Sequence, residues 1–215
     1  MTVPIPTPIL RLVHVDNLHI ILRRGGIHAP HLTPKDGLDY KAIHNTDIQE
    51  KRHVRPVSCG PGGTIHDYVP FYFGYLSPML LQLKTGQVQG YTEGQEPLIY
   101  LVSTAQLVQQ SGTGFVFTDG HGVKRFTAWF DNLADLDKVC WDMVYQRYWK
   151  DDPLGDNDRK RRKQAEFLVH KFCPWSLIQK IAVINDCVKS KVEDILAGFP
   201  EALKRLVKVK PDWYY

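Results

Sequence analysis

The sequence predicts a single-domain α+β fold that covers residues 1–215. Of these residues, 43% are hydrophobic and 23% are charged, which is the composition of an ordinary globular domain with one core. Short β-branched runs alternate with helical segments, but their spacing is not the regular spacing of βαβ units. No strand leads into a Gly-rich phosphate loop, so an irregular mixture is favoured over a doubly wound parallel sheet.

The first elements are a strand and a short helix. Residues 9–15 alternate and include β-branched side chains, so we expect a strand there. Asp16 is then expected to cap a helix over residues 17–24, which Gly25 and the next glycine end. Residues 26–44 are rich in Gly, Pro and His and predict a long loop.

A helix and an aromatic strand follow. Residues 46–49 have the spacing of a capping box, which predicts a helix that begins at about residues 47–53. Residues 59–63 form a glycine-rich turn. Residues 67–73 predict a strand, in which Pro70 indicates an edge position or a bend.

The middle of the chain predicts two strands and two helices. Residues 98–102 have the pattern of a buried strand, after which Ser103 and Gln106 are expected to cap a helix. Residues 115–117 lead into the glycine-containing turn 119–122. Residues 131–149 have helical periodicity.

The last part of the chain predicts three strands. Residues 165–170 and 181–185 are expected strands, separated by a short helix that Pro174 begins. A helix over about residues 190–197 ends at Gly198, and residues 206–209 form the last strand.

Charge and composition exclude several classes of protein. The formal net charge is +4, which permits nucleic-acid binding without requiring it. No apolar run is long enough to span a bilayer, and no signal peptide precedes the first strand, so we expect a cytoplasmic protein without membrane contacts. The four cysteines have no CxxC spacing and the nine histidines no HExxH spacing, so we expect no metal site.

Residues 159–163 are five consecutive cations, and Glu166 follows them at the start of a predicted strand. The simpler interpretation is a solvated loop neutralised by the preceding aspartates, with Glu166 pointing to solvent. The functional interpretation is an anion-binding loop beside a working carboxylate, since glutamate is rarely buried unless it is paired or active.

Aromatic and basic side chains near the predicted strands allow similar pairs of interpretations. The aromatic run at residues 66–73 can pack in the core or provide a stacking platform for planar rings. Arg52 can belong to a polar helix face or clamp an anion. His14 shares its strand face with Leu12, which favours a core histidine over a ligand.

Five segments in a characteristic order carry a family resemblance. They are residues 14–18 (His-Val-Asp-Asn-Leu), 48–52 (Ile-Gln-Glu-Lys-Arg), 66–72 (His-Asp-Tyr-Val-Pro-Phe-Tyr) with 77–80 (Ser-Pro-Met-Leu), 162–169 (Arg-Lys-Gln-Ala-Glu-Phe-Leu-Val) and 210–215 (Lys-Pro-Asp-Trp-Tyr-Tyr). Together they resemble the DarT family of DNA ADP-ribosyltransferase toxins. The resemblance implies an ADP-ribosyltransferase-like split, mixed β-sheet around a NAD⁺ cleft with flanking helices.

The resemblance also implies an activity and its residues. ADP-ribose is transferred from the co-substrate NAD⁺ to a base in single-stranded DNA, most often thymidine and in some relatives guanosine. The catalytic roles fall on Glu166 and Arg52. Contacts to NAD⁺ are expected from Arg11, His14, Asn17, Tyr72, Met79 and His121, and contacts to DNA from Lys51, Arg159, Lys160, Arg161, Arg162 and Lys163. A macrodomain antitoxin of the DarG type is the expected partner.

Two other functions stay open on the residues alone. An ADP-ribosyltransferase acting on RNA or protein would share the fold and Glu166. A non-catalytic module for single strands would use the aromatic and basic segments and consume no NAD⁺.

Overall fold

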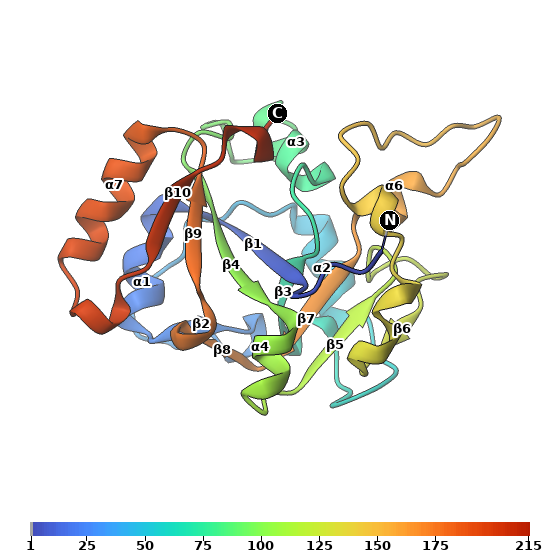
Figure 1. Ribbon diagram of the computed structural model, residues 1–215, viewed down its shortest axis with the longest axis horizontal. Coiled ribbons are helices and arrows are strands. Elements are labelled where there is room, and N and C mark those ends of the chain that lie inside the picture. The colour runs from blue at the N-terminus through green and yellow to red at the C-terminus, as the bar shows by residue number, and fades with distance from the viewer. Residues whose placement is uncertain (1) are drawn as a thin grey trace.

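A mixed eight-stranded sheet forms the centre of the computed structural model, which describes residues 2–215 (Figure 1). The strand order is β10-β9-β4-β1-β3-β7-β5-β6. Strands β9 and β10 are parallel, and the other pairs are antiparallel. The strands are β1 (Pro8–His14), β3 (Tyr68–Tyr72), β4 (Leu98–Thr104), β5 (Phe115–Thr118), β6 (Trp129–Phe130), β7 (Glu166–His170), β9 (Lys180–Val183) and β10 (Leu206–Val209).

The sheet divides between β1 and β3. These two strands share a single register position, Leu10 opposite Tyr72, whereas β1 pairs with β4 along its whole length. Where the strands have diverged, the Nη1 of Arg11 donates a hydrogen bond to the Pro70 carbonyl over 2.8 Å. The expected split, mixed sheet is therefore confirmed, with one arginine side chain bridging the two halves.

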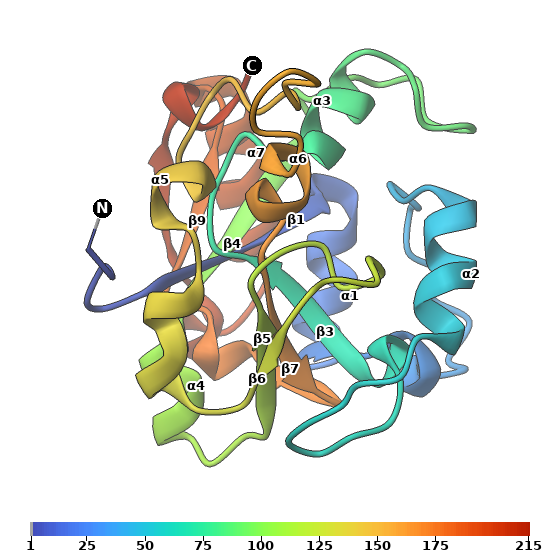
Figure 2. The same cartoon turned by 90° about the vertical axis from the view of Figure 1, so that its right-hand side faces the viewer.

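Helices flank this sheet on several sides. In Figure 1, α7 and α1 lie together beside β9 and β10, and Figure 2 shows α2 at the edge of the molecule opposite α4 and α5. The helices are α1 (Leu18–Arg23), α2 (Thr46–Val54), α3 (Pro78–Lys84), α4 (Ala105–Gln110), α5 (Trp141–Val144), α6 (Arg159–Lys163) and α7 (Asp186–Ala197). A small second sheet pairs β2 (Gly26–His28) with β8 (Phe172–Pro174).

Side-chain alternation along β1 explains why both faces of the sheet are covered. Ile9 and Val13 belong to the larger hydrophobic cluster, while Leu10 and Leu12 belong to a second cluster on the other face. Successive residues of a strand point to opposite faces, so a strand that is apolar on both faces must be buried on both. The central strand is therefore a rigid base for polar groups at its ends.

Several local predictions are wrong at the helix starts. Asp16 does not cap a helix, because its own N–H donates to His14 Nδ1 at the start of a 3₁₀ turn that precedes α1. Helix α2 begins at Thr46, one residue earlier than expected, and Asn45 instead of Thr46 caps it by accepting from the N–H of Ile48. Helix α4 is capped by Thr104 and not by Ser103, which is the last but one residue of β4.

Other differences concern whole segments. Residues 26–44 include β2 and a short 3₁₀ helix, and residues 131–149 form a 3₁₀ helix and the short α5 instead of one long helix. Helix α7 begins four residues earlier than expected, at Asp186, since Asn185 caps it. Pro70 lies in a strand between two others and not at an edge, and it pairs with Leu168 of β7.

Residues 159–163 are helix α6 and not the expected loop. The exposed segment before it, residues 150–157, is the part that Figure 1 shows extending away from the molecule. Two residues separate the end of helix α6 from β7, so the basic run lies close to Glu166, the first residue of that strand.

Candidate active site

A cleft of about 990 Å³ lies where the sheet divides. Residues of α2 line part of this cleft, and in Figure 2 the segment that follows β5 reaches toward that helix. The cleft is lined by most of the predicted site residues: Arg11, Asn17, Lys51, Arg52, Tyr72, Met79, His121, Lys160, Arg161 and Glu166. Its volume lies in the usual range for ligand pockets, about 300–1,000 Å³.

Glu166 is the most deeply buried acidic group of the cleft, with 1% of its surface exposed. Its Oε2 lies 2.8 Å from Nη1 of Arg52, and its Oε1 accepts from the same nitrogen at 3.1 Å. The N–H of Gly122 donates to Oε1, also at 3.1 Å. A charged group in this position is stabilised only by such partners, so the carboxylate is paired, oriented and not solvated.

The turn after β5 provides the third contact of Glu166. The N–H of Glu166 donates to Thr118 Oγ1, and that hydroxyl donates to the Gly120 carbonyl over 2.7 Å. A side chain on Gly122 would place its Cβ 3.1 Å from Ile65 and 3.6 Å from Glu166 Oε1. The absence of a side chain therefore leaves room for Ile65 beside the turn.

Arg52 reaches the carboxylate from the last turns of α2. Only 7% of its surface is exposed, and its Nη2 is buried without a hydrogen-bond partner among the described residues. An unpaired buried N–H costs about 1–3 kcal/mol. A ligand oxygen that binds in the cleft can remove this cost, so the geometry prepares Arg52 to donate to a substrate.

His121 and Tyr72 flank the carboxylate as neutral polar groups. Burial lowers the pKa of His121 to about 4, so its ring is neutral at neutral pH, and its Nε2 lies 4.0 Å from Glu166 Oε1. Burial also raises the pKa of the Tyr72 hydroxyl, assisted by the charge of Glu166. Tyr72 stands opposite Glu166 in the β3–β7 register, and its hydroxyl lies 4.0 Å from Met79 Sδ.

The predicted residues near the start of the chain have different positions. Arg11 lines the cleft, and burial lowers its pKa to about 10, which leaves it charged at neutral pH. Asn17 also lines the cleft, but its amide exchanges two hydrogen bonds with the main chain of Lys41. Asn17 therefore fixes the segment around Lys41 against the cleft.

His14 lies outside the cleft lining that the structure describes. It is 1% exposed, it accepts from the N–H of Asp16, and its Nε2 lies 3.3 Å from Glu93. Burial lowers the pKa of this ring. These contacts agree with the core histidine that the strand pattern favours, and the expected contact to NAD⁺ stays a prediction.

Three of the five cations of α6 are held by the protein itself. Arg161 donates to Asp119 at 2.8 Å and twice to Asp158 at 2.7 Å, and Arg162 pairs with Asp156 and Asp158. Lys163 is 3% exposed and donates to two main-chain carbonyls, and burial lowers its pKa to about 7. Arg161 and Arg162 are therefore neutralised by aspartates, as in the simpler interpretation of the basic run, whereas Lys163 is buried against main-chain carbonyls.

The remaining cations are better placed to meet a ligand. Lys160 is exposed at the cleft rim, whereas Arg159 is half-buried and donates to the Tyr148 carbonyl. Lys51 is exposed on the opposite side of the cleft. The expected DNA contacts of Arg162 and Lys163 are not supported, because both side chains are occupied within the protein.

Sequence reasoning missed two parts of the site. The N–H of Gly122 contacts Glu166 although a main-chain group leaves no signal in the residue type. Lys124, Arg125 and Phe126 follow this turn and line the cleft, and Phe126 is 86% exposed. Two cations and an aromatic residue directly after a glycine-containing turn are the signal that could have indicated them.

Comparison with known proteins identifies the family. The family model described as "ssDNA thymidine ADP-ribosyltransferase, DarT" matches residues 10–215. The chain belongs to the DarT family. As a DarT enzyme, it transfers ADP-ribose from NAD⁺ to single-stranded DNA, which confirms the expected activity and co-substrate.

Relatives of this DarT chain match along its whole length. The DNA ADP-ribosyl transferase of Thermus sp. (strain 2.9) is 44% identical over 214 residues, which cover 100% of this chain and 99% of that protein. The structure of Thermus sp. 2.9 DarT in complex with ADP-ribosylated ssDNA superimposes with a TM-score of 0.94 at 43% identity, covering 100% and 99% of the two chains. Its complex with NAD⁺ gives a TM-score of 0.89 at 42% identity, with both chains fully covered. No helix within residues 2–215 is long and apolar enough to cross a membrane.

Proposed function

We propose that this DarT enzyme attaches ADP-ribose to thymine in single-stranded DNA and that Glu166 and Arg52 carry the reaction. The supporting observation is the buried carboxylate of Glu166, held in the cleft by Arg52 and the Gly122 N–H. A buried acid with fixed partners in a cleft is a typical feature of a catalytic group. Binding alone would not require it, so the geometry gives no support to a non-catalytic module.

Glu166 would act on the ribose. When the bond between ribose C1′ and the nicotinamide nitrogen breaks, nicotinamide leaves with the bonding electrons and positive charge develops on the ribose. A carboxylate beside the ribose stabilises that charge in the transition state more than in the ground state. Thymine then forms the new bond to C1′ through a ring nitrogen, and the proton of that nitrogen passes to Glu166 or to water. A base in this position contributes about 10²–10⁴-fold.

Arg52 would orient this carboxylate and hold the substrate. Nη1 contacts Glu166, which leaves the unpaired Nη2 for a phosphate or a base carbonyl. A guanidinium supplies two donors in a fixed plane, which a lysine cannot reproduce. The neutral ring of His121 offers a further hydrogen-bonding group without adding a positive charge beside the developing cation.

The DNA strand would enter over the basic rim. Lys51, Lys124, Arg125 and Lys160 are exposed cations that line the cleft. Phosphate contacts of this kind position a strand without reading its sequence. The exposed ring of Phe126 lies among them and can stack on a base next to the target. Duplex DNA is excluded because pairing hides the target edge of thymine, and flipping costs a few kcal/mol.

We also propose that a macrodomain antitoxin removes the modification and that the enzyme acts in the cytoplasm. Both statements rest on membership of the toxin family. Coexpression with a DarG-type macrodomain tests the first, since growth should be restored only when the partner is present. Toxicity that persists beside an active macrodomain would contradict it.

Mass spectrometry of oligonucleotides tests the substrate. A single-stranded oligonucleotide with one thymine should gain ADP-ribose in the presence of NAD⁺, and its duplex should not. A matched oligonucleotide with cytosine in place of thymine serves as the control, and the Glu166→Gln protein shows the background. Equal labelling of strand and duplex, or labelling of the cytosine control, would contradict the proposal.

A further inference from the structure

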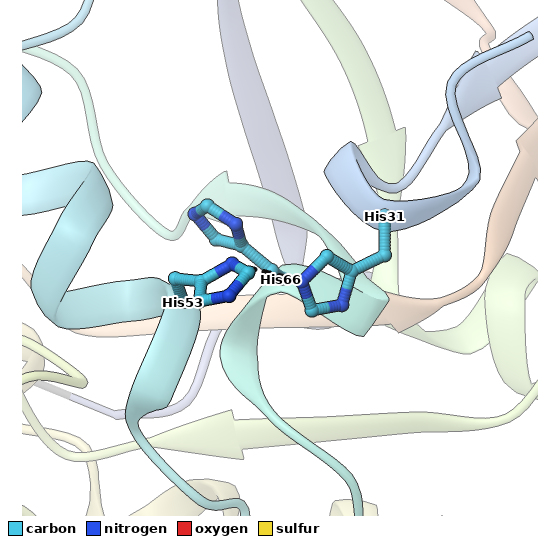
Figure 3. Close-up of side chains that lie close together, drawn as sticks. All are labelled: His31, His53 and His66. Atoms are coloured by element: carbon cyan, nitrogen blue, oxygen red, sulfur yellow. Dashed lines mark hydrogen bonds between the residues drawn. The ribbon is translucent and has the colours of Figure 1, made fainter.

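Three histidines from separate segments meet beside α2 (Figure 3). His31 belongs to a 3₁₀ helix (Pro30–Leu32), His53 to the end of α2, and His66 to a 3₁₀ helix (Ile65–Asp67) that precedes β3. One ring nitrogen from each lies within 4.8 Å of the others. Spacings of 22 and 13 residues along the chain give no motif, which is why the sequence predicted no metal site.

The three rings stand nearly perpendicular to one another. The ring centroids are 4.7 Å apart for His31 and His53, and 5.4 Å apart for each pair that includes His66. The interplanar angles are between 74° and 87°. The rings therefore do not stack face to face, and Figure 3 shows all three directed into the same space.

Hydrogen bonds fix which ring nitrogens are free. The Nδ1 of His31 lies 3.0 Å from Asp67 Oδ1, and the Nε2 of His66 lies 3.1 Å from Gln49 Oε1. Both partners are oxygen acceptors, so each of these nitrogens carries the proton. The lone pair is left on Nε2 of His31 and on Nδ1 of His66. Metal-binding histidines almost always donate their second N–H to a carboxylate or another oxygen in this way.

We propose that His31, His53 and His66 form a binding site for a divalent transition-metal ion, with Zn²⁺ as the ion that fits best. Imidazole nitrogens suit Zn²⁺ and its neighbours in the first row, whereas Mg²⁺ and Ca²⁺ require oxygen ligands. Three histidines and one water complete a tetrahedral site.

The rings must move closer together to hold an ion, since one nitrogen from each lies within 4.8 Å of the others. With Zn–N distances of about 2.0–2.1 Å, ligand nitrogens in a tetrahedron lie about 3.3–3.4 Å apart. Nε2 of His31 and Nδ1 of His53 are 3.0 Å apart and share a hydrogen bond. The ion would take the place of that hydrogen bond: the proton on Nδ1 of His53 moves through solvent to Nε2 of the same ring, and the exposed side chains of His31 and His53 can rotate to bind the ion.

The site lies beside the cleft, because His66 lines it whereas His31 and His53 lie outside its lining. His53 follows Arg52 in α2, and Gln49, the partner of His66, is on the same helix. A bound ion would connect the end of α2 to the segments around residues 31 and 66. We therefore infer a positioning role, in which the metal fixes the helix that presents Arg52 to Glu166.

Metal titration of the untagged, chelator-treated full-length protein tests the site. Isothermal titration with Zn²⁺ should show one ion per chain, and Mg²⁺ should show no binding. His31→Gln and His53→Gln should each weaken Zn²⁺ affinity by more than tenfold. His19→Gln is the matched control, because His19 is a partly exposed histidine on α1 outside the cluster. The Zn²⁺ affinity of this variant should equal that of the wild type.

Two further measurements separate a built site from a metal-free histidine network. At a Zn²⁺ concentration of about 100 times the Kd, the melting temperature should rise by roughly 5 °C or more in the wild type and not in His53→Gln. Hydrogen exchange of the α2 amides should slow with Zn²⁺, which a merely superficial ion would not cause. If Zn²⁺ does not bind stoichiometrically, or if His31→Gln and His53→Gln bind it as tightly as the control His19→Gln, the result is an adventitious ion only, and the proposal is overturned. None of these readouts depends on ADP-ribosylation.

Discussion

The buried pair of Arg52 and Glu166 predicts a coupled loss of stability and activity. The side chains are 8% and 2% exposed, and their contacts are 2.8 and 3.1 Å long. Removing one partner of such a pair typically costs about 3–5 kcal/mol, because the other charge stays buried without compensation. Glutamine at position 166 keeps an amide oxygen for Gly122 and Arg52, so Glu166→Gln should cost about 3 kcal/mol, near the lower end.

A double-mutant cycle measures this coupling. Arg52→Met should cost a similar free energy of unfolding, but adding it to Glu166→Gln should cost little more, since no unpaired charge then remains. The coupling energy should reach about 2 kcal/mol, in the range of contacting residues. The assays are urea unfolding and melting temperature, where 1 kcal/mol corresponds to roughly 2–4 °C in a domain of this size.

Activity should not follow stability in the cycle. Glu166→Gln and the double variant should both lose more than about 10²-fold in transfer to a thymine oligonucleotide, although the double variant should be little less stable than Glu166→Gln alone. A Glu166→Gln protein as stable as the wild type would refute the assignment of a charged pair. Additive unfolding energies within about 0.5 kcal/mol would refute the coupling.

Three further changes have defined outcomes. Arg52→Lys should not restore transfer, because a point charge cannot replace the guanidinium that contacts Glu166 and keeps a second donor free; near-normal turnover would show that charge alone suffices. In a plot of the logarithm of the single-strand binding constant against the logarithm of salt concentration, Lys124→Ser and Lys160→Ser should each make the slope shallower by about 0.7. Lys208→Ser, on β10, should leave the slope unchanged. Equal slopes for all three variants would show that the lysines of the cleft rim do not contact the DNA. Burial lowers the pKa of Lys163 to about 7, so the unfolded chain binds more protons than the folded chain between pH 7 and about 10.4. The free energy of unfolding of the wild type, measured in urea relative to Lys163→Met, should therefore rise by roughly 1–3 kcal/mol between pH 7 and 9.5. An equal difference at both pH values would show that the ammonium of Lys163 stays charged in the folded state.

Strands with a strong local pattern could be predicted from the sequence. The last strand occupies residues 206–209 as predicted, and β1 differs from the prediction by one residue at each end. Such runs are β-branched and short, so local preference and tertiary burial agree. Residues 131–149 have helical periodicity, yet their apolar side chains instead pack onto the core through two short helices and irregular chain. Periodicity records which side chains are buried and not how the backbone brings them there.

The candidate site was less accessible to reasoning from spacing. Arg52 and Glu166 are 114 residues apart, and only the family resemblance placed them together. The same resemblance assigned His14 to NAD⁺, although the alternation of β1 correctly indicated a core histidine. The basic run was overestimated, because a sequence shows the number of cations but not the aspartates folded against Arg161 and Arg162.

The anchoring of Arg161 has a consequence for how the enzyme can be remodelled. Its side chain joins α6 to Asp119 and Asp158, and its carbonyl accepts from the N–H of His121. The exposed segment 150–157 lies ahead of this anchor and contacts α6 through Asp151 and Asp156, so its length can change between these two aspartates without moving Glu166. Exposed loops with few ordered contacts tolerate insertion and exchange, and each doubling of loop length costs only about 0.6 kcal/mol. The segment is therefore a natural graft site, where a loop from another relative could be transplanted to alter the neighbouring bases that are preferred while the chemistry stays intact.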